Sequence, residues 1–203
     1  MRKEFRLIAA LGAQIREDWR TNFRDWTLPG FRAVAVYRIG SWVRVRREGF
    51  LQSMAFRLYL VMYRYVRNHY GIELPATVSV GRRLVIGHQS GIVIHPHAEI
   101  GDDCMIRQNV TLGSATPDRV FQEAPKLGNR VQIGAGAVIV GKVRIGDGAR
   151  IGPNAVVLTN VPAGASVFVS PPRIISIQKP QVEVVRPSSI AAEVGESTFE
   201  ART

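Results

Sequence analysis

The 203-residue chain has a single cysteine, Cys104, and few acidic residues for its many basic ones. One cysteine excludes an internal disulfide framework and fits a protein of a reducing compartment. No stretch approaches the roughly 18–20 apolar residues of a transmembrane helix, so the sequence predicts no membrane-spanning segment. Hydrophobic residues make up 46% of the chain, which excludes global disorder and supplies the core of one or two domains.

The excess of basic over acidic residues lies mainly in the first third of the chain. Lys and Arg number 27 against 16 Asp and Glu, a formal net charge of +11 (27 − 16). Residues 1–72 hold fourteen Lys or Arg and five Asp or Glu, a net +9, so the other 131 residues carry only +2. Gly, Val and Ile dominate after residue 72. We therefore expect a basic α-helical region at 1–72 followed by a β-rich region.

Apolar periodicity predicts three helices in the basic region, at 3–20, 31–47 and 50–69. Pro29 with Gly30 breaks the chain before the second helix, and Gly49 before the third.

The third predicted helix is amphipathic, with Arg57, Arg64 and Arg67 opposite its apolar face. That face comprises Leu51, Met54, Ala55, Leu58, Val61, Met62 and Tyr65. We expect it to pack on the β-rich region or on a neighbouring subunit. Peripheral contact with an anionic membrane surface stays an alternative. Nucleic acid is not an expected partner, because no recognised binding module accompanies the basic residues.

The β-rich region repeats with a period of six. Aliphatic residues recur at Leu74, Val80, Ile86 and Ile92, then at Ile100, Ile106 and Leu112, and again at Leu127, Ile133, Ile139, Ile145, Ile151 and Val157. Neither a helix nor an alternating strand keeps this period, whereas a parallel β-helix does. Each aliphatic residue is expected to point inward. The glycine that often follows it is expected at a corner of the coil, where either positive φ or close backbone approach is needed. Thirteen hexads give roughly four coils.

Two irregularities interrupt the period. Residues 115–125 lie inside the gap between Leu112 and Leu127, and we interpret them as a functional loop that leaves the coil. A two-residue slip around His95, Pro96 and His97 is expected only to adjust a corner. The hexad pattern is lost towards the C-terminus, so we place the β-helix at 73–178 and a disordered tail at 179–203.

Residues 72–160 resemble the serine acetyltransferase family of hexapeptide acyltransferases. The resemblance is closest to the subgroup that acts in polysaccharide biosynthesis. The matching stretches are 72–75, 87–94, 108–113, 125–128 and 133–137, and Pro29, Gly30 and Phe31 match the end of that family's helical region. The resemblance implies a left-handed parallel β-helix, acetyl-CoA as donor, a homotrimer and a cytoplasmic enzyme. A lipid-linked acceptor would bring that enzyme to the inner face of the membrane.

The resemblance also assigns catalytic roles. His88 corresponds to the family's general base, which removes the proton of an acceptor hydroxyl as it attacks the thioester. Glu73 lies where the family has an acidic residue, fifteen positions earlier, and would hold the other ring nitrogen of His88.

Acetyl-CoA is expected to lie along the coils between subunits, as in the family. The positions here that match its binding site are Gly113, Ser114, Ala135, Pro153 and Arg173. No residue is assigned to a metal.

Three departures from the family concern the acceptor. True serine acetyltransferases have Asp before the catalytic His, and an Arg-His pair before the Pro-Lys that follows the loop. Gly87, Glu123 and Ala124 occupy these places here. Because the lost residues recognise an amino acid zwitterion, we favour a sugar hydroxyl over L-serine, which remains the alternative.

Two functions of other classes are alternatives. A zinc enzyme like the γ-carbonic anhydrases would need three histidines, and the spacing of His88, His95 and His97 does not match that family. If the protein were a non-catalytic assembly module, the His88→Ala substitution would leave its measurable properties unchanged. Cys104 is interpreted as a small hydrophobic residue.

Overall fold

A computed structural model describes residues 2–45, 49–115, 123–171 and 173 of the chain. It begins with three helices, α1 (Arg2–Thr21), α2 (Pro29–Arg44) and α3 (Phe50–Tyr65), and the short π-helix η1 (Val66–Tyr70). The helices and the coils that follow them form one compact unit, Met1–Ser170, and the second unit is Pro171–Thr203. The predicted tail, 179–203, lies outside the described residues.

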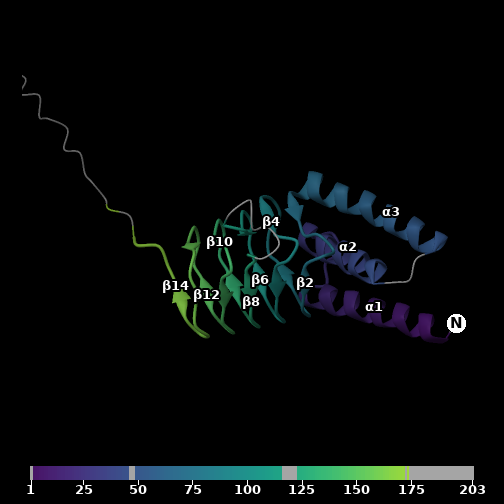
Figure 1. Ribbon diagram of the computed structural model, residues 1–203, viewed down its shortest axis with the longest axis horizontal. Coiled ribbons are helices and arrows are strands. Elements are labelled where there is room, and N and C mark those ends of the chain that lie inside the picture. Colours follow the sequence, from purple (N-terminus) through teal and green to yellow (C-terminus); the bar gives the residue numbers. More distant parts are fainter. Residues whose placement is uncertain (1, 46–48, 116–122, 172, 174–203) are drawn as a thin grey trace, which may run out of the picture. The chain divides into compact units, whose positions relative to one another are not determined.

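Fourteen short strands are wound into three parallel sheets, and from β1 to β13 each successive strand enters the next sheet (Figure 1). Sheet A contains β1 (Ile72–Glu73), β4 (Ile92–Ile94), β7 (Thr111–Gly113), β10 (Val138–Val140) and β13 (Val156–Val157). Sheet B contains β2 (Ser79–Val80), β5 (Glu99–Ile100), β8 (Lys126–Leu127) and β11 (Arg144–Ile145). Sheet C contains β3 (Val85–Ile86), β6 (Met105–Ile106), β9 (Gln132–Ile133), β12 (Arg150–Ile151) and β14 (Ser166–Val167). The predicted left-handed β-helix behind a small helical region is confirmed.

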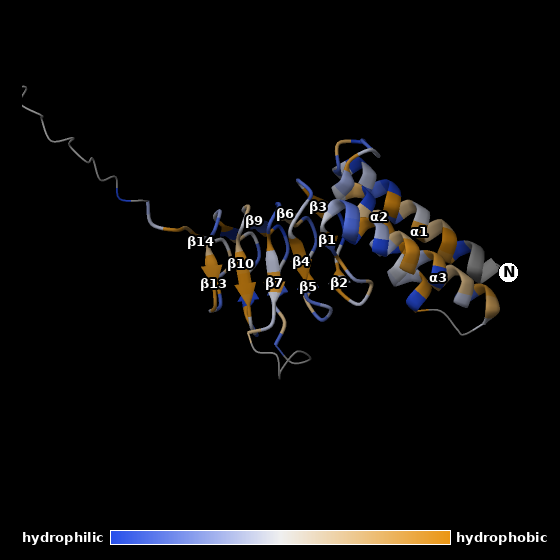
Figure 2. Ribbon diagram, turned by 90° about the horizontal axis from the view of Figure 1, so that it is seen from above, coloured by the Kyte–Doolittle hydropathy of each residue, from blue (hydrophilic) through white to orange (hydrophobic). Residues whose placement is uncertain are grey.

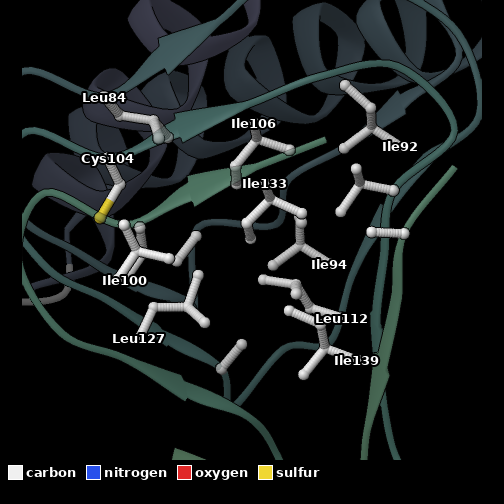
Figure 3. Close-up of a cluster of buried hydrophobic side chains, with 14 of the residues drawn as sticks. Leu84, Ile92, Ile94, Ile100, Cys104, Ile106, Leu112, Leu127, Ile133 and Ile139 are labelled. Atoms are coloured by element: carbon white, nitrogen blue, oxygen red, sulfur yellow. The ribbon is translucent and has the colours of Figure 1, made fainter. Parts of the chain in front are cut away.

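The interior of the coils is a column of aliphatic side chains (Figure 3). The inward-facing residues at the hexad positions are at most 5% exposed, apart from half-buried Val80 at one end of sheet B. Sheets A and C each have five strands, one more than the expected four coils. The difference arises because β1 begins before Leu74, and β14 lies beyond Val157, the last predicted hexad.

The two-residue slip in the six-residue period was predicted at the wrong corner of the coil. Ile86 pairs with Ile106, 20 residues on, whereas Ile94 pairs with Leu112, 18 residues on. The two additional residues therefore lie between Ile86 and Ile94, at the corner formed by residues 87–91, and not at His95–His97. Sequence could not decide this, because Ile92 and Ile94 are both aliphatic and both buried.

Most glycines of the hexads serve close backbone approach, and Gly87 is an exception. A Cβ on Gly134 would lie 2.6 Å from the backbone nitrogen of Pro153 in the next coil, and one on Gly101 would collide with the carbonyl oxygen of Gly128. The positive φ angles fall on other glycines, such as Gly91 at 65°. Of the two expected reasons for these hexad glycines, the structure therefore supports the second.

The helices are fixed to the first coil by polar contacts. Arg38 of α2 makes a buried ion pair with Asp18 of α1, with 2.8 Å between Nε and Oδ2, and its Nη1 donates to the carbonyl oxygen of Val80. The Tyr37 hydroxyl donates to the carbonyl oxygen of Val78 at 2.7 Å. A buried charge needs such partners, so these contacts specify how α1 and α2 meet the coil.

The helix bounds differ from the predicted ones at most ends, by between one and four residues, and α2 ends at Arg44 instead of the predicted residue 47. Pro29 belongs to the first turn of α2, where its missing N–H is not needed. The regular turns of α3 end at Tyr65, and the chain leaves η1 through Gly71, whose φ is 61°. Among the described helices, none has the length and hydropathy needed to cross a bilayer.

Candidate active site

His88 lies on the corner where the chain turns from sheet C to sheet A, which we call the C–A corner. It is exposed, on the segment lengthened by two residues. Ser90 fixes this segment from both sides, because its N–H donates to the carbonyl of Tyr70 at 2.8 Å and its carbonyl accepts from the N–H of Asn109 at 2.9 Å. The extended corner therefore holds the imidazole of His88 outside the regular coil.

Glu73 lies on β1, and its half-buried side chain points out of sheet A in register with Val93. Its charge affects Tyr63 of α3. Burial, and to a smaller extent the charge of Glu73, raise the pKa of Tyr63 to about 12. Within the described residues, no hydrogen bond or ion pair joins Glu73 to His88. Tyr63 was missed by sequence reasoning, because nothing local links a helix residue to a strand ten positions later.

The positions matched to acetyl-CoA binding divide into two groups. Ala135 and Pro153 lie at the C–A corner of later coils, as His88 does, and the N–H of Asn154 beside Pro153 donates to the carbonyl of Ala135 at 2.8 Å. Gly113 and Ser114 lie at the opposite ends of the sheet A strands, at the A–B corner, and are half-buried. Arg173 is exposed and belongs to the second unit.

The predicted loop also begins at the A–B corner, directly after β7. Residues 116–122 lie outside the described part of the chain, and the loop ends at Pro125, whose carbonyl accepts from the N–H of Glu99 at 3.1 Å. His88 and the described ends of the loop therefore lie at opposite ends of the sheet A strands.

His95 and His97 occupy the A–B corner one coil before the loop. His95 is 9% exposed, its N–H donates to the carbonyl of Leu112 at 2.7 Å, and its Nδ1 accepts from the backbone N–H of His97 at 3.2 Å. The strand β4 separates both from His88. The three histidines are thus not assembled as a zinc site would require, and the described residues contain no cluster of three metal-ligating side chains.

Two further residues singled out in the sequence are Cys104, which packs in the core, and Gly87, which has free space around it. Cys104 is buried, its Sγ lies 3.1 Å from the carbonyl oxygen of Gly128, and burial raises the pKa of its thiol. A Cβ added at Gly87 would have no neighbour nearer than 3.8 Å. Steric conflict therefore does not explain why the family's Asp is missing beside His88.

Known proteins share both the repeat and the whole architecture. The family described as bacterial transferase hexapeptide (six repeats) matches residues 124–159. WcaB of Escherichia coli K12, which carries the name of a colanic acid biosynthesis acetyltransferase, is 33% identical over 131 residues, 64% of this chain and 78% of WcaB.

Serine acetyltransferases are also similar. That of Helicobacter pylori is 38% identical over 115 residues, 57% of this chain and 63% of the enzyme. Serine acetyltransferase isoform 3 of Entamoeba histolytica, solved in complex with cysteine, shares the fold with a TM-score of 0.69 at 24% identity over 84% of this chain. The match spans 63% of that structure's chain, so this chain covers less than two thirds of both serine acetyltransferases.

Proposed function

The chain belongs to the hexapeptide-repeat serine acetyltransferase family of acetyltransferases, and from that premise we propose that it transfers acetyl from acetyl-CoA to a sugar hydroxyl in exopolysaccharide or capsule assembly. The observation that carries this proposal is the extended corner, which presents His88 at the end of sheet A where Ala135 and Pro153 also lie.

His88 acts as the general base in this proposal. Its imidazole accepts the proton of the acceptor hydroxyl while the oxygen attacks the thioester carbonyl, and backbone N–H groups stabilise the tetrahedral oxyanion. When the C–S bond breaks, the imidazolium returns the proton to the thiolate of CoA, so the products are the O-acetyl ester and free CoA. Glu73 is the proposed carboxylate that orients His88.

A sugar acceptor is supported by the residues at three positions. Gly87 has no charge, Ala124 is buried, and neither they nor Glu123 reproduce the cationic pair and Asp with which the family holds an amino acid. A neutral polyol needs hydrogen bonds and no charge pairing. L-serine remains the second candidate, because the Helicobacter pylori serine acetyltransferase is 38% identical over the matched region.

The acceptor is tested by measuring thiol release from acetyl-CoA. We expect turnover with nucleotide sugars or short glycans and little with L-serine. Efficient serine turnover would reverse the choice of acceptor, and no turnover with either class, in protein that folds and binds acetyl-CoA, would contradict the proposal.

A homotrimer is the proposed assembly. Three β-helices around an axis bring the C–A corner of one copy beside the A–B corner of the next when sheet A faces the axis. This arrangement would place His88 of one copy near Gly113 and Ser114 of another. The outer face of sheet A supports it, since Val93 and Val156 are 44% and 64% exposed there.

The cytoplasm is the proposed location, because acetyl-CoA is the donor. If the acceptor sugar is carried on a lipid, the enzyme acts at the inner face of the membrane. Co-sedimentation with vesicles that contain anionic lipid tests this point, and binding that does not depend on the anionic lipid would argue against a role for the basic helices.

A further inference from the structure

The outer face of α3 carries five apolar side chains that nothing in the described chain covers. Leu51, Met54, Leu58, Val61 and Tyr65 are between 49% and 79% exposed. The helix packs through the neighbouring face, where Tyr59 is 4% exposed and its hydroxyl accepts from the N–H of Ala76. Of the two expected partners of this apolar face, the β-rich region therefore does not cover these five residues, which we call the α3 stripe, and packing on a neighbouring subunit stays a prediction.

The spacing of the α3 stripe is the spacing of a helix–helix seam. Its members follow one another by three, four, three and four residues, as the two apolar positions of a heptad repeat do. A helix that lies on a membrane usually has a wider apolar face with basic residues around it. The narrow stripe fits a second copy of the same helix better than a lipid surface.

The flanks of the α3 stripe indicate how copies would meet. Arg57 and Arg64, seven residues apart, follow one side, whereas the half-buried Ala55 and Met62 follow the other. In a parallel assembly each flank faces the opposite flank of the next helix, so the arginine stems would cover Ala55 and Met62 and like charges would not meet. An antiparallel pair would place the arginine flanks together, at an electrostatic cost.

The position of α3 suits a threefold axis beside sheet A. The helix continues through η1 into β1, the first strand of that sheet, and all three helices extend from the first coil along the direction in which the coils are stacked (Figure 1). Hydrophobic segments recur along α3, and the sheet A strands are also largely hydrophobic (Figure 2). The α3 stripe and the exposed valines of sheet A would thus contribute to one interface.

We propose that the α3 stripes of three copies associate in parallel around the threefold axis and hold the first coils together. The inference rests on the proposed homotrimer and identifies the surface that maintains it. The seam is also linked to the candidate site, because α3 carries Tyr63, whose pKa is raised in part by the charge of Glu73.

Sedimentation velocity of the full chain over a range of concentrations tests the seam. The Leu58→Glu variant should dissociate at concentrations at least tenfold above those at which the wild type does. Ile8→Glu, at a position 53% exposed on α1, is the matched control and should remain trimeric. A wild-type protein that is not trimeric would overturn both the assembly and the seam, whereas a Leu58→Glu variant as stably trimeric as the wild type would overturn the seam alone.

Cross-linking tests the parallel arrangement without a buried charge. Oxidation of the Leu58→Cys variant should give disulfide-linked pairs, because the same residue of parallel copies meets at one level. Ile8→Cys should give none, and Cys104 adds little background because it is buried. Absence of cross-links in a trimeric variant would contradict the parallel seam. Wild-type sedimentation with phosphatidylglycerol vesicles that Leu58→Glu abolishes, with no change in assembly, would instead identify a membrane as the occupant.

Discussion

The coils bury their large apolar residues, whereas helix α3 leaves several of its own exposed. In the coils, each inward aliphatic residue stacks on the equivalent residue one turn away, so repetition of the motif is enough to bury it. In α3, the five residues of the α3 stripe are between 49% and 79% exposed. The coils therefore complete their own core, whereas the described part of the chain leaves these residues of α3 uncovered.

The largest expected effect is a loss of turnover without a loss of stability. His88→Ala should lower turnover by roughly 10²–10⁴-fold, because a general base is removed. His88 is exposed, so the melting temperature should change little. Steady-state thiol release and thermal unfolding of the same sample provide the check, and unchanged turnover would favour the non-catalytic alternative.

The second prediction concerns the junction between helices and coils. Asp18→Ala leaves the buried guanidinium of Arg38 without its carboxylate, and loss of one member of a buried ion pair costs roughly 3–5 kcal/mol. Denaturant unfolding measures the change. Asp18→Asn, which keeps the side-chain shape and one oxygen acceptor, should lose less, and a loss below about 1 kcal/mol for the alanine variant would show that the pair does not anchor α2.

The third prediction compares the two kinds of apolar position directly. Ile133→Ala opens a cavity in the column of stacked side chains and should reduce the free energy of unfolding by about 2–5 kcal/mol. Ile8→Ala on α1, where half of the side chain is exposed, should change it by no more than about 0.5 kcal/mol. Equal losses in urea unfolding would contradict the contrast between coils and helices.

The smallest expected effect lies at the surface of the same junction. Hydrogen bonds from Arg82 and then from Arg83 lower the pKa of Glu17 below its ordinary value of 4.5. The lowered pKa means that the stabilisation is present above about pH 4.5 and is lost as the pH falls through the folded-state value. Because Arg82 is largely exposed, Glu17→Gln should cost at most about 1 kcal/mol at pH 7. The difference from wild type should shrink in acid, and a constant difference would exclude the ion pair as its cause.

Much of the fold was predictable because the coil repeats in one dimension. A residue that recurs every six positions, such as Ile133, Ile139 and Ile145, must face one axis, so sequence alone located the inward residues. The same logic failed between Ile86 and Ile94, where two buried isoleucines two positions apart allow two registers. Only strand pairing placed the additional residues at the corner of His88.

The candidate site was predictable only in part. The motif around His88 pointed to a base, and the structure places it on an extended corner with Ala135 and Pro153 at the same corner of later coils. The role assigned to Glu73 stays a prediction, and its effect on the pKa of Tyr63, a residue of a helix, is one that no local pattern encodes. Gly113 and Ser114 lie at the opposite corner, a separation that depends on how the chain winds.

The sequence by itself determined the β-helix, its inward residues, the basic helical region and the histidine that is the proposed base, because each depends on repetition, composition or a local motif. Tertiary structure alone decided the register at residues 87–91, the contact between Arg38 and the first coil, and the outward direction of the α3 stripe. The physical reason is that amphipathic spacing defines an apolar face, whereas the surface that covers the face is chosen by the packing of elements distant in the chain.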